Sequence, residues 1–237
     1  MKNRNVLGLA ALALVAAAIA VGTTAFADTN PGTPNNTSKH PAADAKAEAV
    51  ADMALATELA AYGRKHKDAL ALITAARIFK GTSTEKMEAK PETHGPTDAK
   101  DDGKEDAGLD AKSLLAQAGE YSGEDKALKA LAERVASEAS RGAVGGPKSG
   151  RYRVWGRCKN AFVVRFRGAR LARVSIAGSG NTDLDLYVYD ENGHLIGVDR
   201  RAGDRGYVSF CPRWTGNFRI EIHNLGHYTN IYSVWTN

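Results

Sequence analysis

Short stretches of alternating apolar and polar residues fill the last third of the chain. In "AFVVRFRG", Val164 and Phe166 lie on one side of an extended chain, and Arg165 and Arg167 lie on the other. The same period of two recurs in "LARVSIAG" (171–178) and "NFRIEIHN" (217–224). Because Gly and Asn turns separate these short strands, the pattern predicts an antiparallel sandwich or barrel over residues 151–237.

A helical period governs the preceding segment, residues 41–140. In "ADAKAEAVADMALATELAAY", Ala51, Leu55, Leu59 and Tyr62 share one stripe and Val50, Met53, Ala54 and Ala61 line the opposite side, so the helix could pack on two sides. Gly63 predicts its end. Further helices are expected at about 68–79, 113–118 and 124–140. The predicted fold class is therefore α+β in separate parts, with a small N-terminal helical module followed by an all-β domain.

Three polar segments interrupt these patterns. Residues 28–40, rich in Pro, Asn and Thr, predict a flexible leader, and "RGAVGGPKSG" (141–150) predicts a linker. The segment at about 80–110 contains "KPETHGPTDAKDDGKED", which has almost no large apolar side chain. Such a segment buries too little surface to offset its ordering entropy, so we expect a disordered insertion there.

Residues 1–27 have the composition of an export signal. Lys2 and Arg4 precede an apolar run over residues 6–21, and "AFA" (25–27) fits the small-x-small cleavage pattern. An uncleaved anchor is the alternative, because the run approaches the roughly 20 residues that span a bilayer. After cleavage we expect no transmembrane segment and a protein that is periplasmic or secreted.

Cys158 and Cys211 are the two cysteines of the chain. In an oxidising compartment they are expected to pair as a disulfide. Two unpaired, partly buried thiols are the alternative, because the sequence does not reveal their geometry.

Positive charge is concentrated in the predicted sandwich. Residues 151–237 carry 13 Lys and Arg against 7 Asp and Glu, and 12 of the 13 are arginines. If their strands are neighbours, Arg165, Arg167, Arg173 and Arg219 form a binding face for an acidic polysaccharide, lipid headgroup or protein. Nucleic acid is not an expected partner of an exported protein. The alternative is that the arginines keep the sheet faces soluble and the edges unpaired.

The stretch "NTDLDLYVYDENGHLIGVDR" (181–200) places two aspartates in an otherwise apolar strand. Alternation directs Leu184 and Leu186 to the core and the aspartates to the other side, where they are expected to bond backbone N–H groups or arginines. The alternative is calcium, which takes roughly six to eight oxygen ligands. Its candidate ligands are Asn181, Asp183, Asp185, Asp199 and Asp204.

The same stretch carries a family resemblance. "SGNTDLDLYVYDENGHLI", followed by "GDRGYVSFCPRWTGNFRIEIHN" and a last strand "NIYSVWTN", resembles the bacterial pre-peptidase C-terminal domain. The resemblance covers about residues 152–237 and implies a jelly-roll-like β-sandwich that serves exported enzymes as an accessory domain. Some relatives carry structural calcium with help from an acidic linker, whereas the linker here is basic. Nothing upstream resembles a peptidase.

Enzyme signatures are missing from the sequence: there is no G-x-S-x-G, no HExxH and no phosphate-binding glycine loop. His223 and His227 have a spacing that serves zinc best on a helix, but "HNLGH" predicts a loop. We therefore expect an exported, non-catalytic binding or accessory protein that presents its arginine-rich face to an acidic partner. A calcium-stabilised structural module and a cryptic hydrolase are the alternatives.

Overall fold

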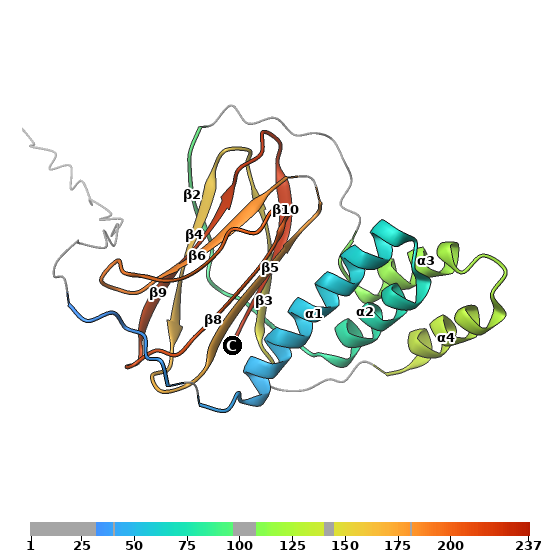
Figure 1. The fold of residues 1–237 in the computed structure, drawn as a ribbon, viewed down its shortest axis with the longest axis horizontal. Coiled ribbons are helices and arrows are strands. Elements are labelled where there is room, and N and C mark those ends of the chain that lie inside the picture. Colours follow the sequence, from blue (N-terminus) through green and yellow to red (C-terminus); the bar gives the residue numbers. More distant parts are fainter. Residues whose placement is uncertain (1–31, 40, 97–107, 140–144, 181) are drawn as a thin grey trace, which may run out of the picture.

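The computed structural model describes residues 32–39, 41–96, 108–139, 145–180 and 182–237. Within these ranges a group of helices lies beside a β-sandwich (Figure 1). This confirms the predicted fold class of a helical module followed by an all-β antiparallel sandwich. The predicted signal peptide and Asn181 lie outside the described residues.

The sandwich consists of two five-stranded sheets. Sheet A has the order β1-β3-β10-β5-β8, and sheet B has the order β2-β4-β9-β6-β7. All neighbours are antiparallel except β1 and β3, which are parallel. The strands are β1 (Glu85–Lys86), β2 (Glu92–His94), β3 (Lys148–Val154), β4 (Lys159–Phe166), β5 (Ala172–Gly178), β6 (Leu184–Tyr189), β7 (Leu195–Asp199), β8 (Arg205–Phe210), β9 (Gly216–Asn224) and β10 (Asn230–Thr236).

The core of the sandwich is built from the inward side chains of both sheets. On β6, Leu184, Leu186 and Val188 are fully buried, as the alternation predicts. On the neighbouring β9, Phe218 and Ile220 are buried in the same layer. Because successive residues point to opposite faces, the intervening side chains of β6 and β9 form the outer face of sheet B.

Each of the four described helices starts at an aspartate. They are α1 (Ala45–His66), α2 (Ala69–Gly81), α3 (Ala111–Tyr121) and α4 (Lys126–Ser137). The side chains of Asp44, Asp68, Asp110 and Asp125 accept hydrogen bonds from first-turn N–H groups and so satisfy donors that have no partner within the helix.

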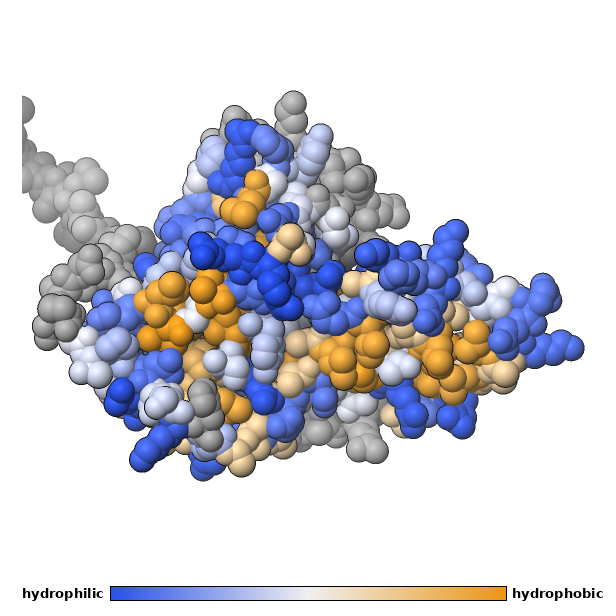
Figure 2. Space-filling view, viewed as in Figure 1, coloured by the Kyte–Doolittle hydropathy of each residue, from blue (hydrophilic) through white to orange (hydrophobic). Residues whose placement is uncertain are grey.

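The buried side of α1 differs from the predicted stripe. Leu55 and Tyr62 are 53 % and 52 % exposed, and small residues such as Ala56 and Ala60 form the packed side. Figure 2 shows hydrophobic residues at the surface of the helical part. Gly63 does not end the helix, because α1 continues to His66 and Gly63 faces Leu72, where a Cβ would lie 2.7 Å from Leu72 Cδ2. Alanine and glycine allow α1 and α2 to approach closely.

The helices pack on the outer face of sheet A. Val50 and Met53 of α1 are buried against Ala177 of β5 and Trp235 of β10. The ring of Phe79 on α2 lies 6.0 Å from that of Trp235. In Figure 1 the helices accordingly lie on the side of β3, β5 and β8. α1 and the end of α2 thus cover one face of the sandwich, a contact that no pattern in the sequence predicts.

Part of the predicted disordered insertion forms sheet edges. β1 pairs with β3 at the edge of sheet A, and β2 pairs with β4 at the edge of sheet B. Met87, between these strands, is buried in the sandwich core. The prediction is therefore wrong for residues 82–96, while residues 97–107 lie outside the described part of the chain. The sandwich also starts earlier than expected, since β3 begins at Lys148 inside the predicted linker.

The predicted flexible leader is fixed to the sandwich over residues 32–39. Asn35 is fully buried, and its backbone N–H donates to Asp190 Oδ2 at 2.9 Å. Trp214 N–H donates to Asn35 Oδ1 at 3.1 Å, and Thr37 N–H donates to the carbonyl of Cys211 at 2.9 Å. The turn residues of the sandwich supply these partners, so composition alone gave the wrong prediction.

Among the described residues, no helix combines the length and the apolar character needed to cross a membrane.

The predicted disulfide is wrong. Cys158 and Cys211 are both buried and are not bonded to each other. Cys158 directly precedes β4, whereas Cys211 follows Phe210, whose ring packs 5.2 Å from that of Phe166 at the other end of β4. The length of β4 separates the two cysteines by about 25 Å at roughly 3.3 Å per residue, and a disulfide needs Cα atoms within about 7 Å.

We expect thiol titration to reflect this geometry. The native protein should react slowly with a thiol reagent, because both side chains are buried. After unfolding without reductant, both cysteines should react. An unfolded protein without reactive thiols would show that a disulfide is present after all.

Candidate functional site

The aspartates of β6 lie at the position that the alternation predicts, on the side away from the core. Asp183 precedes the strand, and its Oδ1 accepts a hydrogen bond from the N–H of Gly203 at 2.8 Å. Asp185 is only 5 % exposed and accepts a hydrogen bond from Tyr187 Oη at 3.0 Å. Both carboxylates therefore have local partners.

The other candidate calcium ligands also have partners. Asp199 accepts bonds from Arg201 Nη2 at 2.8 Å and from the N–H of Tyr207 at 2.9 Å. Burial alone would raise the pKa of Asp199, but the bonds from Arg201 and Tyr207 outweigh it and lower the pKa. Asp204 accepts a bond from the N–H of Gly180 and lies 3.4 Å from Arg205 Nη1.

Over the described ranges, no group of three or more His, Cys, Asp or Glu is placed to hold a metal ion. Asn181, one of the proposed ligands, is outside those ranges. The calcium site therefore stays a prediction.

The four arginines assigned to one binding face lie on two sheets. Arg165 and Arg219 lie on the outer face of sheet B, on the neighbouring strands β4 and β9, and Arg165 and Arg167 also line a cavity at the end of β4. Arg173 belongs to sheet A, where its Nη1 donates to the carbonyl of Ala47 at 2.9 Å and lies 3.5 Å from Glu48 Oε2, so it attaches α1 to the sandwich. The period of two identified the outward arginines but not the sheet to which each belongs.

The outward side chains of β6 and β9 form the candidate functional site. Tyr187 and Tyr189 alternate with buried residues on β6, and Arg219, Glu221 and His223 alternate with buried residues on β9. The register places Tyr187 opposite Glu221 and Tyr189 opposite Arg219. We call this surface, together with Lys159 from the adjoining β4, the tyrosine face.

Glu221 is the centre of the tyrosine face and is only 3 % exposed. Its carboxylate lies 3.1 Å from Lys159 Nζ, 3.2 Å from Arg219 Nε and 2.8 Å from His223 Nε2. Burial alone would raise the pKa of Glu221, but the bonds from His223 and Lys159 and the charges of Lys159 and Arg219 lower it to about 2. Glu221 therefore stays ionised and holds three side chains in place.

These charged groups orient the aromatic rings. The rings of Tyr187 and Tyr189 are stacked at 10°, with centroids 6.3 Å apart. Arg219 Cζ lies 4.8 Å from the ring centroid of Tyr189, and the ring of His223 lies 4.6 Å from that of Tyr187. Burial and the bond to Asp185 raise the pKa of Tyr187, so its hydroxyl remains a donor. The result is a pair of nearly parallel rings in a fixed setting.

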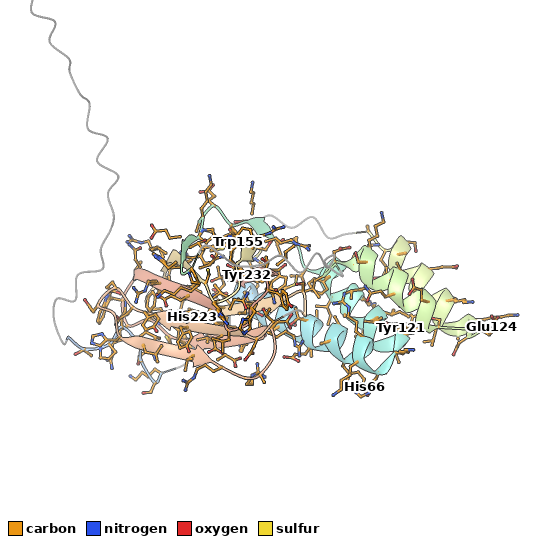
Figure 3. The ribbon with its side chains drawn as sticks, turned by 90° about the horizontal axis from the view of Figure 1, so that it is seen from above. His66, Tyr121, Glu124, Trp155, His223 and Tyr232 are labelled. Atoms are coloured by element: carbon orange, nitrogen blue, oxygen red, sulfur yellow. The ribbon has the colours of Figure 1, made fainter. Side chains whose placement is uncertain are left out.

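The tyrosine face is on the sheet opposite the helices. In the described part of the chain the helices pack on sheet A, and Figure 3 shows His223 in the sandwich, away from His66, Tyr121 and Glu124 of the helical module. Val163, opposite Arg219, and Val198, opposite Tyr187, are 44 % and 39 % exposed. A cavity of about 460 Å³, lined in part by Lys159 and His223, continues the surface toward the start of β4.

The two histidines with metal-like spacing have different surroundings. His223 is on a strand and contacts Glu221, whereas His227 follows the strand and its Nδ1 lies 2.6 Å from Arg157 Nη2. The loop predicted for "HNLGH" is confirmed for residues 225–227, whereas His223 and Asn224 belong to β9.

Glu221, His223 and Lys159 were not among the site residues expected from the sequence. Their outward direction on β4 and β9 was readable from the alternation. Their meeting with Tyr187 was not, because it depends on β9 pairing with both β4 and β6, which are far apart in the chain.

Comparison with known proteins does not assign a family. No protein-family model matches the chain, and no curated protein matches it. Among solved structures, the chain is similar to a family GH115 4-O-methyl-α-glucuronidase, BtGH115A, with specificity for decorated arabinogalactans. The identity is 11 % and the TM-score 0.28, and the match covers 53 % of this chain and 24 % of that one. A likeness this low carries no argument about function, and the resemblance to the pre-peptidase C-terminal domain rests on the quoted residues alone.

Proposed function

We propose that this protein is an exported, non-catalytic binding protein whose tyrosine face binds an acidic polysaccharide. The observation that carries the proposal is the pair of stacked rings, Tyr187 and Tyr189, held beside the buried carboxylate of Glu221 and its cations on a sheet that none of the described helices covers. Periplasmic or extracellular location is part of the proposal and rests on the pattern of residues 1–27.

The two tyrosines supply flat apolar surface for sugar rings. Contacts with Arg219 and His223 hold the two rings in place, so the loss of side-chain entropy on binding is small. Successive outward residues of a strand are about 6.6 Å apart, and the two centroids are 6.3 Å apart. This spacing suits an extended polymer better than a single small molecule.

The flanking groups supply polar recognition. Lys159, Arg219 and His223 are partly exposed, at 37 %, 29 % and 28 % of their side chains, while the carboxylate they share is buried. A ligand therefore meets the donors of the cluster and not its acceptor. Uronic acid carboxylates and sugar hydroxyls are suitable acceptors for these donors, which favours a polysaccharide over the other acidic partners considered.

The charge cluster supports binding over catalysis. A general acid needs a pKa near the working pH, and the pKa of Glu221 is about 2. Glu221 is therefore not suited to deliver a proton at neutral pH.

Affinity electrophoresis tests the proposal. The mature chain should be retarded in native gels that contain polygalacturonate, and less so in gels with a neutral glucan. Tyr187→Ala and Tyr189→Ala should each raise the dissociation constant obtained from the retardation about tenfold, because each removes one ring on which a sugar stacks. Tyr187→Phe, which keeps the ring, should bind nearly as well as the unchanged protein.

Tyr62→Ala is the matched control, because Tyr62 is equally aromatic and is exposed on α1, away from sheet B. Equal retardation of Tyr187→Ala and Tyr62→Ala would contradict the proposal, provided that both variants melt as the parent does.

A further inference from the structure

A second charged surface lies where α1 meets the edge of the sandwich. It is a cavity of about 540 Å³ formed by the first turn of α1, the start of β3, the end of β4 and the turn that leads into β5. The beginning of α1 and the last residues of the chain lie beside each other at this edge (Figure 1). Phe166, Leu171 and Ala172 supply its apolar wall.

Five cationic side chains line this cavity, which we call the basic cavity: Lys46, Lys148, Arg165, Arg167 and Arg170. The acidic side chain in the lining, Asp44, has its Oδ1 bonded to the N–H of Ala47 as the cap of α1. The five cations come from three separate stretches of the chain, so the fold and not a local run of charge brings them together.

None of the five cations forms an ion pair or a side-chain hydrogen bond with any described residue. Other arginines of the sandwich differ in this respect. Arg173, Arg201 and Arg205 each lie within 3.5 Å of a carboxylate. Like charges around one cavity repel one another, so this arrangement opposes folding unless an anion occupies it.

We propose that the basic cavity binds a multiply charged phosphate or sulfate ester of a soluble ligand. Arginine matches tetrahedral oxyanions with paired donors, and three of the five cations are arginines. The five cations exceed the one acidic side chain of the lining, Asp44, by four charges, which is more than a single carboxylate balances. This site shares no residue with the tyrosine face, so the inference does not depend on the proposed function.

Ligand binding here would also connect the two parts of the molecule. Lys46 belongs to α1, whereas the other four cations belong to the sandwich or the residues that lead into it. A ligand that binds the folded state alone raises the melting temperature. Because the ligand contacts both parts, it should stabilise the packing of α1 on the sandwich as well.

Isothermal titration with two soluble probes, inorganic tripolyphosphate and sucrose octasulfate, tests the proposal on the full mature chain. At least one probe should bind and raise the melting temperature. Tighter binding of tripolyphosphate would indicate a phosphate ester as the ligand, and tighter binding of sucrose octasulfate would indicate a sulfate ester. The triple variant Arg165→Gln, Arg167→Gln, Arg170→Gln should bind at least about tenfold more weakly.

The matched control removes the same charge from a distant surface, by Lys126→Gln, Lys129→Gln and Arg134→Gln on α4. It should lose little affinity. No binding of either probe, or equal losses in the two triple variants, would overturn the proposal. A triple arginine-to-lysine variant guards against misfolding, because it keeps the charge and should retain part of the binding. Polygalacturonate retardation in the same variants should be unchanged, which separates this outcome from that of the tyrosine face.

Discussion

Replacing Glu221 with glutamine is expected to lower the free energy of unfolding by roughly 2 kcal/mol at neutral pH. Glu221 is buried and contacts Lys159, Arg219 and His223, so the substitution leaves partly buried cations without their anion. The full shift of its pKa from 4.5 to about 2 corresponds to a larger value, which we reduce because water screens the partly exposed cations.

The effect should depend on pH in a defined direction. A carboxylate whose pKa is lowered by folding stabilises the protein above its unfolded pKa and loses that stabilisation as the pH falls through its folded pKa. For Glu221 the stabilisation is therefore lost as the pH falls from about 4.5 to about 2. The difference between the parent and Glu221→Gln should therefore be full at pH 7 and should vanish toward pH 2.

Urea unfolding at several pH values measures this difference. Glu92→Gln is the control, because Glu92 is an exposed carboxylate on β2 of the same sheet. Its loss should change stability by no more than a few tenths of a kcal/mol. Equal stabilities for Glu221→Gln and Glu92→Gln would show that Glu221 does not organise the tyrosine face.

Replacing Asp190 with alanine is expected to cost about 3 kcal/mol of unfolding free energy. Asp190 is fully buried, and its carboxylate accepts bonds from the N–H groups of Asn35, Asn192 and His194. Burial alone would raise the pKa of Asp190, but these bonds lower it. Alanine leaves the buried donors without an acceptor and releases the leader from the sandwich.

Two measurements distinguish this result from a general weakening of the fold. Limited proteolysis should cut residues 32–39 faster in Asp190→Ala, because Asn35 N–H loses its acceptor. Asp190→Asn keeps one acceptor oxygen and should show a smaller loss of stability. Unchanged unfolding together with a protected leader would refute the role of Asp190.

The sequence predicted those elements that carry a period. Leu184, Leu186 and Val188 repeat every two residues and occupy the core as expected, and the helical segments begin at aspartates. β1 and β2 have two and three residues, too few for any period to be detected, and they gain their structure by pairing with longer strands. The leader has no apolar pattern and is ordered by partners such as Asp190.

The candidate site was predictable only in part. The alternation placed Tyr187, Tyr189 and Arg219 on outer faces, yet it could not show that β6 and β9 are neighbours. The same limit explains the wrong disulfide. A disulfide was predicted because the chain has two cysteines and an export signal. The positions of β4 and β8 instead place Cys158 and Cys211 at opposite ends of the sandwich.

Amide hydrogen exchange with and without a uronic acid oligosaccharide locates the bound ligand on the protein without any substitution. Binding to the tyrosine face should add protection in β4, β6 and β9 around Tyr187, Tyr189 and Arg219 and leave sheet A and the helices unchanged. Protection confined to sheet A, to the helices or to the residues around the basic cavity would contradict the assignment of the tyrosine face as the binding surface.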